Sequence, residues 1–247
     1  METTKDLVLK FTAATGYAQS DEISLVFPAA MDPMPEIENA QEDVPKKKKR
    51  KVVARQHIYG GRIQKLASVT ASYASSRLNY HLCRHNWDDL APKVRERMVG
   101  HEAYFDGRVI PMESSNEIAE CVFWRSNCDG LRNAISHISQ HHYDVKKLHG
   151  LGLTEQVKAL LNEKNVDVFK DYSPKILFGT WIKKEQVEIK DMIHPKTGEP
   201  LGHSVMRTRL TEGSFNWADW TPKQRSEFII TKFWSDGADF PPKKAKD

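Results

Sequence analysis

Apolar side chains recur at helical intervals in several parts of this 247-residue chain. The pattern predicts a first helix over residues 1–14, with Leu7, Val8 and Phe11 on one side, which Gly16 ends. A second helix is predicted over residues 62–80. Its apolar face consists of Ile63, Leu66, Ala67, Thr70, Ala71, Ala74 and Leu78. The small residues on this face favour close packing against a sheet.

A third helix opens at a capping box, Ser114-x-x-Glu117. Its apolar face consists of Ile118, Val122, Leu131, Ile135 and Ile138. Polar side chains recur at intervals of three and four residues on the other face, namely Arg125, Asp129, Arg132 and Ser136. They form either a ladder of surface ion pairs or the lining of a substrate channel. Two later helices are predicted to begin at the cap residues Thr154 and Thr221.

Strand patterns are mixed among these helices. A β-prone run that begins with Asp21 and Glu22 ends near Phe27, and a short strand is predicted over residues 105–110. Two more strands, over residues 178–189 and 204–210, are joined through a turn at Pro195-Lys196-Thr197-Gly198. Because the order lacks regular βαβ alternation, we predict an α+β fold, with an antiparallel sheet flanked by helices and a C-terminal hairpin and helix.

Residues 29–56 interrupt this pattern with a flexible, polar excursion. An acidic part precedes a run of cations, Lys46, Lys47, Lys48, Lys49, Arg50 and Lys51. The run resembles a monopartite nuclear localisation signal, although it could equally bind RNA phosphates or keep a loop solvated. We therefore expect a cytoplasmic or nuclear protein.

Composition narrows the class of protein. An apolar fraction of 39% is ample for a packed core, and the formal charge of +4 leaves partners to be inferred from local charge. Cys83, Cys121 and Cys128 are too irregularly spaced for a disulfide framework, which favours a reducing compartment. No apolar run approaches the roughly 20 residues that span a bilayer, so no membrane partner is expected.

The adjacent carboxylates Asp21 and Glu22 are the first candidate for chemistry. Neighbouring residues of a strand point to opposite faces, and a buried carboxylate needs a cation or hydrogen-bond donors. Hard divalent cations prefer oxygen ligands, so Mg²⁺ is a candidate partner. The alternative is a solvated turn or a structural ion pair.

The polar face of the predicted helix over residues 62–80 is the second candidate. Arg62, Lys65, Ser68 and Ser72 lie within three turns, where two cations and two hydroxyls could hold a triphosphate. The alternative is a solvated helix face.

Four motifs, in order, resemble those of the tRNA-histidine guanylyltransferase family. They are Gly16-Tyr17-x-Gln19-Ser20-Asp21-Glu22-Ile23-Ser24, Arg62-x-x-Lys65-Leu66-x-Ser68, Phe105-Asp106-Gly107-Arg108-Val109 and Phe123-Trp124-Arg125. The resemblance continues through Asp129-x-x-Arg132-Asn133 and Lys146-x-Leu148-His149-Gly150, which look like the bacterial and phage Thg1-like branch. It covers roughly residues 1–182.

The resemblance implies a palm-like catalytic domain over residues 1–150 and a C-terminal extension over residues 151–247. It also implies an enzyme that adds nucleotides to the 5′ end of tRNA in the 3′-to-5′ direction, either for 5′-end repair or for guanylylation of tRNA-His. Two Mg²⁺ ions would assist, GTP and ATP would be bound, and the protein would form a homotetramer.

By motif match, Asp21 would be a metal ligand and a catalytic residue, with Glu22 beside it. The nucleotide-binding residues implied by the family are Ser20, Arg62, Lys65, Ser68, Asp129, Arg132, Asn133, Lys146 and His149. The last five would position the incoming nucleotide or the tRNA end.

One family segment, an Arg-x-Asp-Gly strand that carries a further metal ligand, does not precede Asp21. We therefore expect that the true start lies upstream, that the chain is a truncated product, or that it has lost catalysis while retaining tRNA or nucleotide binding. A zinc protein is a third hypothesis, with ligands drawn from His81, Cys83 and His85 or from His137, His141 and His142.

Overall fold

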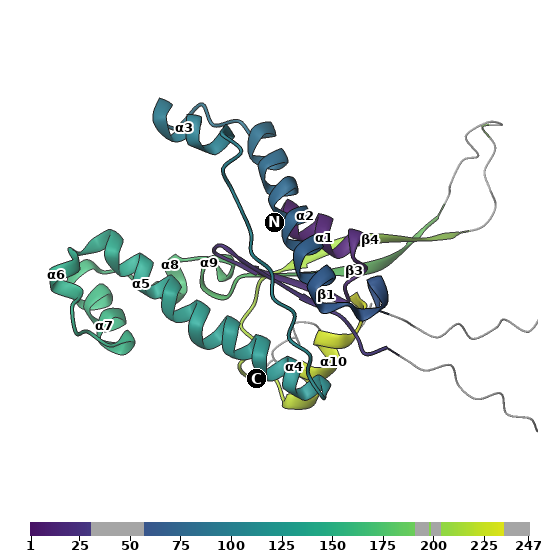
Figure 1. The fold of residues 1–247 in the computed structure, drawn as a ribbon. Helices are drawn as coiled ribbons and strands as arrows, with labels where there is room; N and C mark the ends of the chain where they lie inside the picture. The colour runs from purple at the N-terminus through teal and green to yellow at the C-terminus, as the bar shows by residue number, and fades with distance from the viewer. Residues whose placement is uncertain (31–56, 191–197, 199–203, 235–247) are drawn as a thin grey trace, which may run out of the picture.

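A computed structural model describes residues 1–30, 57–190, 198 and 204–234 (Figure 1). The predicted basic run at Lys46–Lys51 and most of the predicted turn at residues 195–198 lie outside these described residues. No helix in the described part is long and apolar enough to cross a bilayer.

One sheet organises the molecule. Its strands are β1 (Thr15–Gln19), β2 (Glu22–Val26), β3 (Thr180–Ile189), β4 (Val205–Gly213) and β5 (Phe233–Trp234). The order is β2-β1-β3-β4 with antiparallel pairing, and β5 adds to β3 in parallel. The α+β fold with a mostly antiparallel sheet is therefore confirmed.

Helices cover both faces of the sheet (Figure 1). On one face lie α1 (Glu2–Lys10) and α2 (Ile63–Arg84), and on the other lie α4 (Ser115–Phe123) and α10 (Pro222–Ile230). Successive side chains of a strand point to opposite faces of the sheet. Ile182 on β3 packs with Val8 of α1, whereas its neighbour Trp181 packs into the opposite face.

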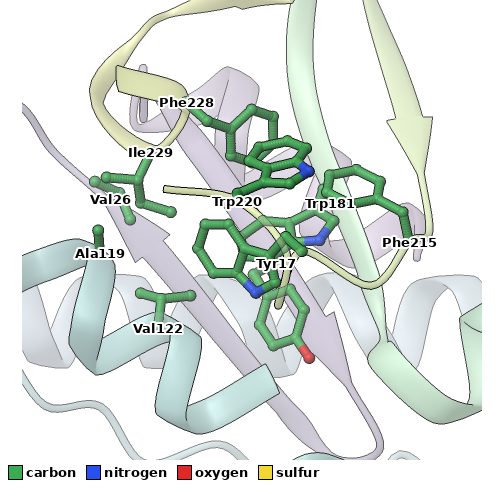
Figure 2. Packing of buried hydrophobic residues seen from close by; sticks show 10 residues of the cluster. Tyr17, Val26, Ala119, Val122, Trp181, Phe215, Trp220, Phe228 and Ile229 are labelled. Carbon is green, nitrogen blue, oxygen red and sulfur yellow. The ribbon is translucent and has the colours of Figure 1, made fainter. Parts of the chain in front are cut away.

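The face under α4 and α10 is an aromatic core (Figure 2). Trp181 is completely buried, and its ring centroid lies 4.5 Å from that of Tyr17 and 4.6 Å from that of Trp217. Phe215 and Phe228 complete its surroundings. Because the segment after β4 supplies Phe215 and Trp217, residues near the C-terminal end help to hold β1 in place.

Gly16 has a different role from the predicted one. It lies within β1, while α1 already ends at Lys10. A Cβ at Gly16 would come within 2.6 Å of Val8 Cγ2, so glycine allows α1 to approach the sheet closely.

The predicted strand over residues 105–110 is wrong. This segment is extended but belongs to no sheet, and it runs along α2 instead. The Phe105 N–H donates to Ser75 Oγ at 2.8 Å, and Asn79 hydrogen-bonds both backbone groups of Ala103. Side chains of α2 therefore satisfy the backbone groups that a strand partner would otherwise satisfy.

A helical lobe extends to the left in Figure 1. It contains α5 (Leu131–His142), α6 (Val145–Leu148), α7 (Leu153–Lys164), α8 (Val168–Asp171) and α9 (Pro174–Phe178). The predicted cap at Thr154 is wrong, because α7 begins one residue earlier and the Gly152 N–H donates to the Glu155 carboxylate at 2.7 Å. The cap at Thr221 is confirmed.

The two predicted units contribute to the same sheet. β1 comes from residues 1–150 and β3 from residues 151–247, and the two strands are hydrogen-bonded neighbours. The boundary at residue 150 stays a prediction as a division between folding units. Helix α3 (Pro92–Val99) lies at the far end of α2, and the short 3-10 turn η1 (Ile58–Gly61) lies directly before α2.

Candidate functional site

The tip of the β1–β2 hairpin carries the predicted carboxylates. Gln19 pairs with Glu22, so Ser20 and Asp21 form the turn between the strands. Asp21 is therefore exposed in the turn rather than in a strand, while Glu22 is the first residue of β2. Ser20 has a φ of +54°, which is uncommon for an L residue and occurs here in a tight turn.

A π-helical segment lies against this tip. The predicted long helix is interrupted between α4 and α5 by η2 (Trp124–Gly130), whose backbone is π-helical. Such segments are rare and occur often at functional sites. The buried Ser126 anchors η2, because its hydroxyl accepts a hydrogen bond from Trp217 Nε1 at 2.8 Å. A second contact joins Asn127 to Asn216 at 2.6 Å.

Four charged residues join the hairpin to the helix, and we call them the ion chain: Glu22, Arg125, Asp129 and Arg132. Arg125 pairs with both Glu22 and Asp129, and Arg132 pairs with Asp129. The Asp129 side chain is only 9% exposed, whereas that of Arg132 is 63% exposed. Arg125, Asp129 and Arg132 are thus ion-paired along the helix, as the ladder hypothesis predicts for these three positions, and Arg125 extends the chain to the hairpin. Whether this face also lines a substrate channel stays a prediction.

Tyr17 and Gln19 attach the β1–β2 hairpin to the end of α9. The Tyr17 hydroxyl donates to the Phe178 carbonyl at 2.9 Å, and Gln19 Nε2 donates to the Leu177 carbonyl at 2.9 Å. These carbonyls belong to the last residues of α9, where helix carbonyls lack partners within the helix. Burial raises the pKa of Tyr17, so its hydroxyl stays protonated and remains a donor.

Gly130 allows η2 to pack directly against the β1–β2 hairpin. A Cβ added there would overlap the side-chain oxygen of Gln19, so only glycine fits between η2 and the hairpin. The structural roles of Tyr17, Gln19 and Gly130 were not predicted. The spacing of Arg125, Asp129 and Arg132 did signal their pairing, but no local pattern indicates the contact between Arg125 and Glu22.

The second predicted group lies at the start of α2. Arg62, Lys65 and Ser68 are exposed there, with Arg62 Nε donating to the Tyr59 carbonyl at 3.1 Å and Lys65 Nζ 5.0 Å from the Tyr59 ring centroid. Tyr59, Gly60 and Gly61 all have positive φ angles. A concavity of about 290 Å³ adjoins them, lined on its described side by Ala30, His57, Gly60 and Gly61. Free N–H groups and two cations make this helix start suitable for an anion.

These two groups do not meet. Figure 1 shows the first turn of α2 at the open end of the β1–β2 hairpin, away from its tip. No hydrogen bond or ion pair between described residues links Arg62, Lys65 or Ser68 to the tip. Asn133 is exposed on α5, and Lys146 and His149 are exposed at α6, at the far end of the lobe. The predicted site residues therefore form three separate groups.

The carboxylates do not form a metal cage. Asp21 has no ion-pair partner among the described residues, Glu22 is paired with Arg125, and Asp129 is paired with two arginines. In the described part of the chain, no three His, Cys, Asp or Glu side chains form a group that could hold a metal ion. A single carboxylate can hold Mg²⁺ only together with waters and substrate phosphates.

The residues of the zinc hypothesis have other partners. His81 Nε2 lies 2.7 Å from Asp6 Oδ2, which also accepts from Arg77, and this cluster joins α1 to α2. Cys83 Sγ lies 3.4 Å from the Nε2 atom of His101. His142 contacts the Tyr172 hydroxyl at 3.3 Å. Among the described residues, neither proposed ligand set is assembled into a group that could hold a metal ion.

Comparison with known proteins supplies independent information. Residues 1–113 match the family model described as Thg1, tRNAHis guanylyltransferase. An uncharacterised protein of Acanthamoeba polyphaga mimivirus is 31% identical over 191 residues, which cover 75% of this chain and 60% of that protein. The chain thus spans less than two thirds of this relative.

Solved structures agree with the fold. A bacterial tRNA(His) guanylyltransferase (Thg1)-like protein in complex with ATP aligns with a TM-score of 0.50 and 26% identity, covering 73% of this chain and 65% of its own. The tRNA(His) guanylyltransferase of Saccharomyces cerevisiae aligns with a TM-score of 0.51 and 18% identity, covering 72% and 69%. At that identity the yeast structure shows the fold alone.

Proposed function

We propose that this chain is a tRNA guanylyltransferase-type nucleotidyltransferase, because residues 1–113 match the Thg1 family model. The family match carries this proposal. Further support comes from the similar bacterial structure, which was solved with ATP, and from the exposed cations at the start of α2. These observations favour a site that handles nucleoside triphosphates.

We assign the groups of residues to different phosphates. Arg62, Lys65 and Ser68 would bind a triphosphate, since exposed cations next to free helix N–H groups favour polyanions. Arg132 would contact the incoming nucleotide beside the hairpin tip, where Ser20 and Asp21 are exposed. Lys146 and His149, on the helical lobe, would contact the tRNA.

The reaction proposed is addition at the 5′ end of tRNA, in the 3′-to-5′ direction. The 3′-hydroxyl of the incoming nucleotide would attack the α-phosphorus of the activated 5′ end. A new P–O bond forms, the bond to the activating phosphate group breaks, and the hydroxyl proton passes to solvent. Positioning of both phosphate groups is the protein's main contribution.

Mg²⁺ would enter with the nucleotide phosphates. Asp21 is the exposed carboxylate at the tip that could contact such an ion, but the described residues supply no cage for it. The family's two-metal mechanism is therefore part of the proposal.

A second candidate is a family member that binds tRNA or nucleotide without catalysis. The ion chain favours it, because Arg125 and Arg132 occupy the carboxylates of Glu22 and Asp129. Self-association as a homotetramer and a cytoplasmic or nuclear location directed by Lys46–Lys51 are further parts of the proposal.

The test is incorporation of radiolabelled GTP into a tRNA that lacks its 5′-terminal nucleotide, with Mg²⁺ present. We expect Lys65→Ala and Asp21→Ala each to lower the rate by roughly 100-fold, as loss of one charged contact to a reacting phosphate does. Lys158→Ala, at an exposed lysine on α7, is the matched control and should retain the rate.

Wild-type protein that binds tRNA but incorporates no nucleotide would contradict the enzyme and support the binding protein. Incorporation that Lys65→Ala leaves unchanged would contradict the assignment of α2 to the triphosphate.

A further inference from the structure

Asp129 is buried between two arginines of unequal exposure. Its side chain is 9% exposed, that of Arg125 is 29% exposed and that of Arg132 is 63% exposed. A carboxylate so covered cannot readily reach a bound nucleotide, whereas the guanidinium of Arg132 faces solvent. The resemblance to the family assigns both Asp129 and Arg132 to nucleotide binding, but in the structure only Arg132 is exposed enough to contact a nucleotide.

The surroundings of Asp129 restrict where it can lie. It occupies the π-helical segment η2, which Ser126 anchors to Trp217 at 2.8 Å, and the next residue, Gly130, packs against Gln19 of the hairpin. The carboxylate is thus fixed relative to both the aromatic core and the hairpin tip. A long arginine side chain loses much of its freedom when it is held by such a group.

We infer that Asp129 is a positioning residue, which holds the guanidinium of Arg132 beside the hairpin tip so that Arg132 binds a phosphate group of the nucleoside triphosphate. Arg125 fills the other side of the Asp129 carboxylate and ties it to Glu22. This inference rests on the proposed function and adds to it that Asp129 acts through Arg132 rather than on the nucleotide.

The alternative is that the ion chain only stabilises the helix and the hairpin. Both roles explain the ion pairs, but they differ in what happens when Arg132 is absent. A positioning residue has no further effect on nucleotide binding once the residue it holds has been removed, because the two act as one unit.

The experiment is a double-mutant cycle measured by equilibrium binding of GTP and of inorganic tripolyphosphate to the full chain. The variants are Asp129→Asn, Arg132→Ala and the double variant. We expect each single variant to raise Kd for both probes about tenfold, in keeping with loss of one charge-assisted hydrogen bond to phosphate. The double variant should bind no more weakly than Arg132→Ala.

The matched control is Asp88→Asn, which makes the same change at an exposed aspartate paired with Arg95 at 2.8 Å. It should leave Kd unchanged. The melting temperature without ligand is recorded for every variant. Arg132→Lys, which keeps the positive charge but not the planar fork, should bind both probes more tightly than Arg132→Ala when Asp129 is present, but not when it is combined with Asp129→Asn.

Three results would overturn the inference. Wild-type binding with an unchanged Kd in Asp129→Asn would leave Asp129 a purely structural residue, and so would single effects that add in the double variant. Wild-type protein that binds neither probe would overturn the proposed function together with the inference, so the two failures can be told apart.

Discussion

Two regions of the molecule bury a charged residue, and they do so in opposite ways. Asp129 in η2 is paired with two guanidinium groups. Lys183 in β3 is 1% exposed, and among the described residues its ammonium nitrogen meets two neutral acceptors, Thr15 Oγ1 at 2.6 Å and the Phe228 carbonyl at 2.5 Å. The Phe228 ring centroid lies 4.5 Å away.

The different partners of Asp129 and Lys183 indicate different roles for the two buried groups. Burial without a countercharge lowers the pKa of Lys183 to about 7, so this amine serves chiefly as a hydrogen-bond donor to the last turn of α10. Asp129 has its burial compensated by opposite charges, one of which remains exposed. A buried charge with an exposed partner can act on a ligand, whereas the enclosed Lys183 can only support the fold.

The largest expected effect concerns Lys183 and pH. Between pH 7 and pH 10.5 the unfolded chain retains a proton on this lysine that the folded chain has released, so folding becomes more favourable as pH rises. The free energy of unfolding of wild type relative to Lys183→Met should therefore increase by about 4 kcal/mol across this range. Urea unfolding near both limits measures it.

Lys158→Met, at an exposed lysine, is the control and should show no such trend relative to wild type. A constant difference between wild type and Lys183→Met would mean that the buried amine remains charged in the folded state. The contrast with Asp129 would then be lost.

The next effect concerns the countercharges of Asp129. Removing both in Arg125→Ala/Arg132→Ala leaves a buried carboxylate uncompensated, and the free energy of unfolding should fall by about 3 kcal/mol. Adding Asp129→Asn should recover most of the loss, as followed by urea unfolding at neutral pH. Arg95→Ala, which breaks the exposed pair with Asp88, should cost less than about 1 kcal/mol. No recovery in the triple variant would refute the compensation argument.

The smallest effect concerns Asp6, whose side chain is 24% exposed and is thus less buried than Asp129 but less exposed than Asp88. Burial alone would raise the pKa of Asp6, but hydrogen bonds from Arg77 and His81 lower it overall. Its stabilising contribution is therefore present above the unfolded-state pKa of about 3.9 and is lost as pH falls further. We expect Asp6→Asn to cost about 1 kcal/mol at pH 7 and progressively less below pH 4, by urea unfolding. A cost that is independent of pH would show that the carboxylate charge contributes nothing.

Local chemistry explains which elements could be predicted. The caps at Ser114 and Thr221 begin helices in the structure, because their hydrogen bonds join residues three apart in the chain. The segment at Phe105 misled the prediction, since a short run that contains Phe105, Val109 and Ile110 also suits an extended stretch laid along a helix. Whether such a run joins a sheet or lies along a helix depends on its partner elsewhere in the chain, which here is α2.

In the candidate site, too, local patterns predicted some features, whereas others depend on contacts between distant segments. The composition of the motifs identified Asp21, Lys65 and Arg132 as candidates, and the spacing within the helix indicated the pairing of Asp129 with its arginines. The separation of the start of α2 from the hairpin tip could not be predicted, because it depends on how α2 crosses the sheet.

The sequence by itself indicated the resemblance to the Thg1 family, the α+β class and the polar side chains available for chemistry. Those depend on residue types and on intervals of two to four positions. Only the tertiary structure decided that Gly130 packs against Gln19, that Glu22 meets Arg125 and that Lys183 is enclosed by β1 and α10. These contacts join segments far apart in the chain, where close packing and the compensation of buried charge select the partners.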